Sequence, residues 1–490
     1  MMRLSNRTLP SLPAGIRRPA YERSRVKTGI VHLGIGAFHR AHQAVYTDDV
    51  LAAGDLSWGI AGASLRSPDT RDALLPQNGL FALNVRDGSG DEVRVIGAIR
   101  DVLVAPENPA ALLAIMADPG IRIVSLTVTE KGYCHNPATG ELDETHPDIR
   151  HDLQHPGAPR SAPGFIVEAL AQRRAAGHSP FTVLTCDNLP ANGRVTKRVL
   201  VDLARLRDPD LGRYLEDGLA CPSTMVDRIV PATTDADRDR VSGLLGVQDN
   251  WPVMAEPFSQ WVIEDRFPAG RPAWPGATFV EDVEPFEFMK LRLLNGSHST
   301  MAYLGYLSGN ETIADAVAQD GMERLIRSLM DDEITPTLPR LPGFDLDAYK
   351  DQLFDRFRNP ALRHRTWQIA MDGSQKLPNR LMGPARERMA QGLPIERIAL
   401  GIAAWMRYVT GIDERGATID VRDPLASDLR ARADRAGRDP GRMVDALLGV
   451  TQMFGADLPA EPRFRDPVRS WLAMLFERGA AETVRTAARM

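Results

Sequence analysis

Short apolar runs alternate with longer helix-like stretches from Thr28 to about position 280 of the chain. The apolar runs are rich in Val, Ile, Leu or Thr and are bounded by turn residues, as buried strands are. They read GIVHLGIG, WGIAGASL, EVRVIGAI, IRIVSLTV and FTVLTCDN. Strands that alternate with helices predict a parallel sheet covered by helices, so we expect an α/β domain over residues 1–280.

After Pro285 the β-rich runs stop, and the apolar residues recur at helical spacing. The clearest helical stretches are PFEFMKLRLLNGSHSTMAYLGYL, ERIALGIAAWMRYVTG and GRMVDALLGVTQMF. We therefore expect a mainly α-helical domain over residues 281–490. The stretch before it, FPAGRPAWPGATF, is rich in Pro and Gly and favours a connector, although its aromatic residues would equally suit packing against the first domain.

Composition places the chain among soluble globular proteins. Hydrophobic residues make up 43% and charged residues 25% of its 490 residues, which is enough apolar material for two or three cores. Acidic residues outnumber basic ones, 64 to 59, so no overall positive field attracts a nucleic acid or an anionic membrane. We expect neither as a partner, and we expect a monomer that binds a small molecule.

Cysteine usage and the N-terminus point to the cytoplasm. The three cysteines, Cys134, Cys186 and Cys221, are an odd number at wide spacing, which fits neither a disulfide framework nor paired zinc ligands. The first residues carry charge and proline where a signal peptide needs an apolar core, and no run of 18 apolar residues follows. We therefore expect a cytoplasmic protein with no membrane span.

The first predicted strand ends in a glycine turn at Gly34 and Gly36, followed by Phe38 and Arg40. Small residues at such a turn let backbone N–H groups approach a pyrophosphate at a helix N-terminus. His39 replaces the third glycine of the dinucleotide fingerprint, and a GxG by itself is more often a tight turn. The position after the first strand of an α/β domain favours a cofactor site, with Gly34, Gly36, Phe38 and Arg40 as candidate residues.

A carboxylate at the end of the second strand binds the ribose of NAD in dinucleotide-binding domains and repels the extra phosphate of NADP. After WGIAGASL the first acid is Asp69, which is our candidate for this role. A loop Asp that caps the following helix is an equally good interpretation. His39 and His42 lack a third ligand at metal-binding spacing, so we expect no metal.

Four polar residues, Glu287, Lys290, Asn295 and His298, follow one another in the apolar segment that opens the helical half. At about 100° per residue on an α-helix they share one face. The simplest alternative is a solvated helix face with a Glu–Lys pair at i,i+3. A second polar group, Asn188 after the strand FTVLTCDN, would line the crevice at the carboxyl ends of a parallel sheet, although Asp-Asn-Leu-Pro is also a common turn.

A set of ordered motifs across the chain resembles the mannitol dehydrogenase family of polyol-specific long-chain dehydrogenases. The motifs are GIGAFHRAHQ, TVTEKGYC, CDNLPANG, MVDRIVP, EPFSQWVIED, KLRLLNGSHS and DGSQKLPNR. The resemblance implies an NAD-binding Rossmann-like domain followed by a helical substrate and catalytic domain, with the active site in the cleft between them. It implies metal-independent hydride transfer at a secondary alcohol.

The resemblance also implies the substrate. The sequence is most similar to family members that interconvert D-fructuronate and D-mannonate, notably at TEKGYC and HRTWQIAMDGSQKLPNR. Oxidation of mannitol, arabinitol or another polyol or aldonate is the nearest alternative, and a non-catalytic NAD sensor is an alternative of another class. Gln368 replaces a substrate-binding arginine of the mannitol-oxidising members, which puts mannitol in doubt.

The family pattern assigns roles to single residues. Lys290 is implied as the general acid–base, because the hydroxyl proton must leave when the hydride leaves. Asn188 and Asn295 are implied as amide donors to the reacting oxygen, and His298 as a ligand of a neighbouring hydroxyl. Glu287 is implied to relay protons between Lys290 and water.

Three further residues are predicted to contact the substrate. By resemblance, Asp227 is an additional active-site acid and Lys376 contacts the substrate. Arg380 lies four positions after Lys376, and an arginine can bind a carboxylate through two parallel N–H bonds. We therefore expect Arg380, with Lys376 as the alternative, to recognise the carboxylate of a sugar acid. A surface ion pair or a helix cap is the competing interpretation of Arg380.

Overall fold

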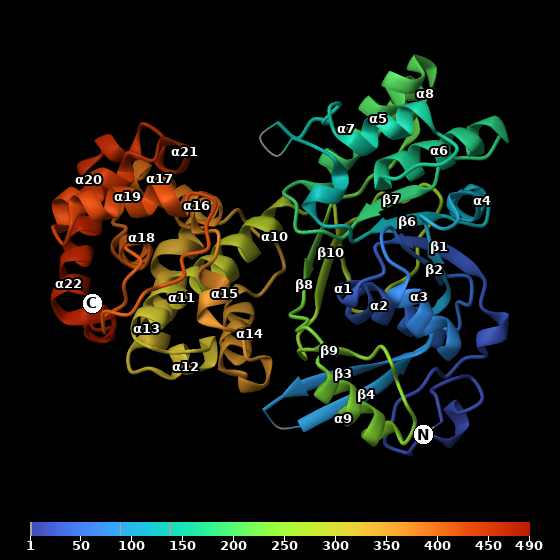
Figure 1. Ribbon diagram of the computed structural model, residues 1–490, viewed down its shortest axis with the longest axis horizontal. Coiled ribbons are helices and arrows are strands. Elements are labelled where there is room, and N and C mark those ends of the chain that lie inside the picture. Colours follow the sequence, from blue (N-terminus) through green and yellow to red (C-terminus); the bar gives the residue numbers. More distant parts are fainter. Residues whose placement is uncertain (1, 89, 137–138) are drawn as a thin grey trace. The chain divides into compact units, whose positions relative to one another are not determined.

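The computed structural model describes residues 2–88, 90–136 and 139–490 of the chain. The chain divides into two compact units, Met1–Glu284 and Pro285–Met490. In Figure 1 the first unit runs from blue to green and the second from yellow to red. Each unit is described by itself.

A five-stranded parallel sheet forms the centre of the first unit, in the order β5-β2-β1-β6-β7. The chain moves outward from β1 to β2 and β5, and then returns to β6 and β7 on the other side of β1. The strand order therefore reverses between β1 and β6, and ligands of open parallel sheets bind beyond the carboxyl ends at such a reversal. The strands are β1 (Thr28–Leu33), β2 (Gly59–Ser64), β5 (Ile99–Val104), β6 (Ile123–Leu126) and β7 (Thr182–Thr185).

Both faces of this sheet are buried, which confirms the predicted α/β class. Val31 packs in a core with residues of α4, α6 and α7, whereas its neighbour Ile30 packs on the opposite face with residues of α2 and the smaller sheets. Figure 1 shows the helices flanking the strands. The helices of this unit are α1 (Ala37–Ala41), α2 (Gln43–Ala52), α3 (Asp69–Leu74), α4 (Pro109–Ala117), α5 (Pro147–Gln154), α6 (Ala162–Ala175), α7 (Asn192–Arg207), α8 (Pro209–Gly218) and α9 (Asp235–Leu245).

Two three-stranded sheets, β4-β3-β9 and β11-β10-β8, complete the first unit. The prediction of one strand over EVRVIGAI is wrong, because β4 ends at Ile96 in an antiparallel hairpin with β3, and β5 begins only at Ile99 in the central sheet. Apolar periodicity does not tell which strand will be the partner. The additional strands are β3 (Phe81–Asp87), β4 (Gly90–Ile96), β8 (Thr224–Asp227), β9 (Val253–Ala255), β10 (Gln260–Glu264) and β11 (Thr278–Val280).

The Pro- and Gly-rich stretch FPAGRPAWPGATF packs against the first unit, which is the second of the two alternatives that the sequence allows. The Trp274 side chain is buried, and its ring lies 4.6 Å from that of Trp261. The rings of Phe267 and Phe279 lie 6.1 and 6.4 Å from the ring of Trp274. The stretch thus belongs to the core around β10.

The second unit is built from helices, as predicted, and α11 and α18 pack against the long α22. Three segments are π-helical: Lys290–Gly296, Leu329–Ile334 and Pro378–Met382. The helices are α10 (Glu284–Met289), α11 (Ser297–Leu307), α12 (Ile313–Ala318), α13 (Met322–Ser328), α14 (Leu346–Arg358), α15 (Thr366–Ala370), α16 (Gly373–Leu377), α17 (Gly383–Ala390), α18 (Glu396–Tyr408), α19 (Ala426–Ala436), α20 (Pro440–Leu448), α21 (Thr451–Phe454) and α22 (Pro462–Ala487), which is kinked at Gly479.

Within the described residues, no helix is both long and apolar enough to cross a membrane.

Candidate active site

The glycine turn after β1 lies against the end of β6. Gly34 has a φ of 91°, and a Cβ atom on it would come within 2.1 Å of the Thr127 carbonyl oxygen, so only glycine fits. The Thr127 hydroxyl donates to the Gly34 carbonyl at 2.7 Å. A Cβ atom on Gly36 would meet nothing closer than 3.9 Å, so its backbone is open to a ligand. The turn therefore fits the backbone approach that a dinucleotide needs.

His39 occupies the position of the third fingerprint glycine, and its ring stacks flat on His32 of β1. The two ring centroids are 3.4 Å apart at an angle of 14°, and both side chains are fully buried. The two ring nitrogens of His32 bond the hydroxyls of Ser125 and Thr127 at 2.8 and 2.9 Å. Burial lowers the pKa of His32 to about 3 and also lowers that of His39, so both rings are neutral. The flat stacking of the two rings accommodates the large side chain of His39 at the position where the fingerprint has a glycine.

Three further candidates for cofactor binding lie close to this turn in sequence. The ring of Phe38 stacks on His42 at 5.1 Å. Arg40 is buried and donates to the Trp251 carbonyl at 2.5 Å, and burial lowers its pKa to about 10. Asp69 is exposed at the first position of α3 and accepts a hydrogen bond from the Ser67 hydroxyl at 2.9 Å. Their contacts with a cofactor stay predictions.

Asn188 follows β7 and Asp227 ends β8, and hydrogen bonds of Asn192 link these two strands. Asn188 is exposed just beyond β7, and Asp227 is the buried last residue of β8. The side chain of Asn192 donates to the Asp187 carbonyl at 3.1 Å and to the Thr224 carbonyl at 2.8 Å. Asn192 thereby fixes the start of β8 beside the end of β7. Asn192 was not identified from the sequence, although it lies in the CDNLPANG motif.

Lys290 and Asn295 lie on a π-helix, so the α-helical geometry expected for this segment is wrong. The segment Lys290–Gly296 joins α10 to α11 and forms hydrogen bonds of the i to i+5 type. The wider turn stacks residues five apart on successive turns, which brings the Lys290 and Asn295 positions nearer to one another than an α-helix would. Such π-helical turns are frequent at functional sites.

Arg292 anchors this π-helix to its own unit and was not identified from the sequence. Its side chain is buried and binds both carboxylate oxygens of Glu387, at 2.6 and 2.7 Å. It also donates to the Thr337 carbonyl at 2.6 Å. A buried arginine with a bidentate partner holds the backbone on either side of it. The signal available in the sequence was a charged residue inside the apolar run LRLL.

His298 is buried in a basic environment. Its ring lies 4.8 Å from that of Phe357 and 5.1 Å from that of His364. Burial lowers the pKa of His298 well below its ordinary value, and the nearby His364, Arg356 and Arg380 lower it further. A neutral imidazole can donate one hydrogen bond and accept another, which suits a substrate hydroxyl.

Lys376 and Arg380 lie on α16 and on the following π-helix. The Lys376 ammonium donates to the Met371 carbonyl at 2.6 Å. The Arg380 guanidinium donates to the Ser299 hydroxyl at 3.0 Å and, at 3.4 Å, to the Asn295 carbonyl. Burial lowers the pKa of Lys376, and it lowers that of Arg380 to about 10. Arg380 thus contacts the helical run on which Asn295 lies. Gln368 is exposed on α15.

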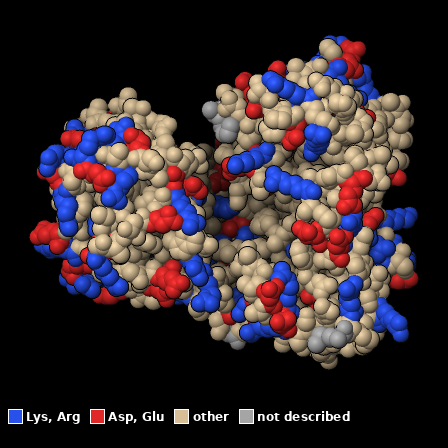
Figure 2. Space-filling model, in the orientation of Figure 1, with Lys and Arg blue, Asp and Glu red and all other residues tan. Residues whose placement is uncertain are grey.

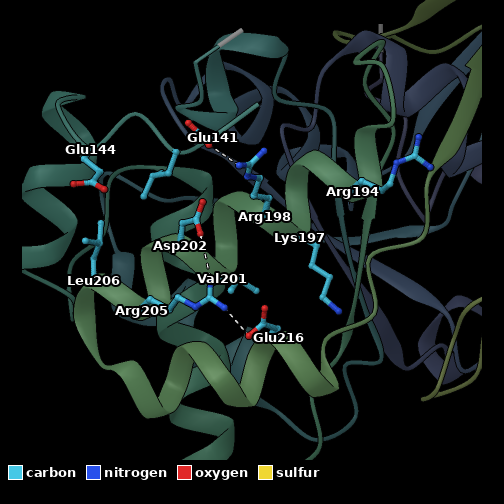
Figure 3. A pocket seen from close by; sticks show the side chains of 11 residues that line it. Glu141, Glu144, Arg194, Lys197, Arg198, Val201, Asp202, Arg205, Leu206 and Glu216 are labelled. Atoms are coloured by element: carbon cyan, nitrogen blue, oxygen red, sulfur yellow. Dashed lines mark hydrogen bonds and ion pairs between the residues drawn. The ribbon is translucent and has the colours of Figure 1, made fainter. Parts of the chain in front are cut away.

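Of the other sites considered, neither a metal centre nor a surface groove is supported. The described ranges hold no group of three or more His, Cys, Asp or Glu that would suit a metal ion. A groove of about 830 Å³ lies along α7, and Figure 3 shows Arg198 turned toward Glu141 and Arg205 toward Glu216, so these four charged side chains pair across it. Figure 2 shows both signs of charge interspersed on each unit.

Comparison with known proteins identifies both units. Residues 28–276 match the mannitol dehydrogenase Rossmann domain, and residues 282–475 match the mannitol dehydrogenase C-terminal domain. The chain is 48% identical to D-mannonate oxidoreductase of Escherichia coli over 477 residues, which cover 96% of this chain and 97% of the relative. It is 40% identical to mannitol 2-dehydrogenase of Aspergillus terreus, with 99% and 98% covered.

A solved structure agrees with these relatives. The ternary complex of Pseudomonas fluorescens mannitol 2-dehydrogenase with NAD and D-mannitol is 41% identical to this chain, with a TM-score of 0.84 and 99% of each chain covered. Both domains of the family are therefore present in this chain, in the family's order and at nearly full length. The chain belongs to the mannitol dehydrogenase family.

Proposed function

We propose that this protein is an NAD-dependent oxidoreductase that interconverts D-fructuronate and D-mannonate. Its family and its 48% identity to a D-mannonate oxidoreductase support the reaction class. Relatives named mannitol 2-dehydrogenase are 40% identical, so identity alone does not choose between a sugar acid and a polyol.

The observation that carries the choice of a sugar acid is the basic environment of His298. Arg356 and Arg380 lower the pKa of His298 by charge, whereas burial lowers the pKa of His364 itself to about 4, so that its ring is neutral and adds no positive charge. D-Mannonate differs from mannitol by one terminal carboxylate, and a positive, partly dry region stabilises such an anion. Arg380 is our candidate for direct contact with it.

The residues of the chain account for the movement of the proton. We assign Lys290 to accept the hydroxyl proton during oxidation and to return it during reduction. Asn188 and Asn295 are assigned as amide donors to the oxygen as its charge develops, which is a role that needs no metal ion. Glu287, three positions before Lys290, is assigned to pass the proton on to water, and His298 to bind a neighbouring hydroxyl.

The first unit offers a fitting place for the dinucleotide. Gly34 and Gly36 would let the backbone meet the pyrophosphate, at the point where the strand order reverses. NAD, when bound, supplies the hydride acceptor. Asp69 is proposed to hold the ribose and so to favour NAD over NADP.

A substrate panel tests the proposal. The purified protein is assayed for NADH oxidation with D-fructuronate, with D-fructose and with further ketohexoses and ketohexuronates. We expect kcat/KM to be highest for fructuronate. A higher value for the neutral sugars would replace the proposal with the alternative of a polyol dehydrogenase, and the absence of turnover with any of them would favour a sensor.

A further inference from the structure

One carboxylate in the first unit, that of Asp187, collects three hydrogen bonds from a single short segment. Its two oxygens accept the backbone N–H of Val128 at 2.9 Å and that of Thr129 at 3.1 Å. The hydroxyl of Tyr133 donates to the same carboxylate at 2.7 Å. Asp187 directly precedes Asn188, so the carboxylate joins the end of β7 to the segment that follows β6.

The segment that it holds is strained. Thr129 has a φ of 64° and a ψ of 163°, a region that residues other than glycine rarely occupy and that costs about 1–3 kcal/mol. Cys134 and Ala191 also have positive φ angles, 51° and 49°. The chain as described has six such non-glycine residues, and these three lie in Val128–Cys134 or just after Asp187.

Packing does not explain this strain. Thr129 is exposed, as are the next two residues, Glu130 and Lys131. A strained and exposed segment persists only where other contacts impose its conformation. Here those contacts come from Asp187, which is half-buried, and from Tyr133, which is buried.

The segment also lies at the crevice where we place the cofactor. Thr127, the residue before Val128, donates from its hydroxyl to Gly34 and from its backbone N–H to Leu33. The segment thus begins against the glycine turn of β1, at the point where the strand order reverses. One connected set of hydrogen bonds runs from the glycine turn through this segment to the end of β7.

We propose that Asp187 is a positioning residue that holds Val128–Tyr133 in its strained conformation as part of the wall of the NAD crevice. This inference rests on the proposed use of the crevice for NAD. The carboxylate acts through the backbone of Val128 and Thr129 and, as their anchor, also fixes the direction of Asn188. It takes no part in proton transfer.

The test compares two aspartates with the same kind of partners. Asp152 is buried in the same unit and accepts two backbone N–H groups, of Arg160 and Ser161, and the Ser161 hydroxyl, but it holds the turn before α6. In Asp187→Asn and Asp152→Asn the new amide presents N–H to a donor, so both variants lose thermal stability. We expect the Kd for NADH, measured by fluorescence titration of the full chain, to rise about tenfold only in Asp187→Asn.

A rise no larger in Asp187→Asn than in Asp152→Asn would overturn the inference. If Asp187→Asn does not fold, Tyr133→Phe removes one of the three bonds and is expected to raise the Kd by a few fold. Failure of the wild-type protein to bind NADH would instead count against the proposed function. The two failures are therefore distinguishable.

Thr129→Gly tests whether the carboxylate acts through the strained residue. Glycine adopts the Thr129 conformation at little cost, so the segment then needs Asp187 less. In a double-mutant cycle we expect the effect of Asp187→Asn on the Kd to fall to less than half in the Thr129→Gly background. An equal effect in both backgrounds would show that Asp187 does not act by imposing this conformation.

Discussion

The two units hold their candidate residues in different ways. In the first unit Gly34, Gly36 and Asn188 lie in turns beyond strand ends, and the side chains of Asp187 and Asn192 bond the backbone near these turns. In the second unit the candidates from Glu287 to His298 lie on one helical run, and a buried arginine, Arg292, ties that run to Glu387.

This difference shows which geometry depends on distant parts of the chain. The crevice of the first unit exists only because β1 and β6 are neighbours, although about 90 residues separate them in sequence. The order of Lys290, Asn295 and His298 is local, because they follow one another on a single helical run. In the second unit Asp372, four positions before the candidate Lys376, also has a positive φ angle.

The largest expected effect tests whether the helical unit contains the general acid–base. Lys290→Ala removes the proposed general acid–base, so kcat should fall by about 10²–10⁴-fold while NADH binding is unchanged. Steady-state kinetics and a fluorescence titration with NADH measure the two quantities. Lys350→Ala is the control, because Lys350 pairs with Asp331 and Asp347 on the same unit and should affect stability alone. Retention of more than about a tenth of kcat would remove Lys290 from its role.

The next effect tests whether the helical unit also selects the substrate. Arg380→Ala should lower kcat/KM for fructuronate roughly 10–200-fold, at about 1.4 kcal/mol per tenfold change, and affect fructose much less. Arg388→Ala is the matched control, because Arg388 is buried on the same unit and donates to the carbonyls of Asp332 and Pro394. Equal losses on both sugars would mean that Arg380 only supports Asn295 and Ser299.

A smaller effect is expected in the first unit, where Asp69 lies at the first position of α3. If Asp69 holds the ribose, Asp69→Ala should raise the ratio of kcat/KM for NADPH to that for NADH several-fold, because a repelling charge is lost. The neighbouring Asp72 pairs with Arg71, so Asp72→Ala is the control. An unchanged ratio would place the ribose-binding acid elsewhere.

No effect is expected from chelators in either unit. Lysine and amide side chains are sufficient for the proposed proton transfer, and the part of the chain that the structure describes holds no three-ligand cluster. Activity is measured after dialysis against EDTA and again after addition of zinc. Loss of activity in EDTA with recovery in zinc would contradict the lysine mechanism.

The sequence by itself determined the class of the fold and the family. Apolar runs of strand length alternating with helices are a local property, and they correctly predicted a parallel sheet followed by helices. The ordered motifs led to the family that the comparisons show. Local order also placed Glu287, Lys290, Asn295 and His298 on one helical run.

The tertiary structure decided what depends on partners far away in the chain. Periodicity does not show that β4 pairs with β3 instead of joining the central sheet, because the apolar pattern of a strand does not identify its partner. The bond between Arg292 and Glu387 and the hydrogen bonds of Asp187 with Val128 and Thr129 join residues about 60 to 95 positions apart. Hydrogen bonds over such separations depend on how the elements pack against one another. The local spacing of apolar residues does not predict them.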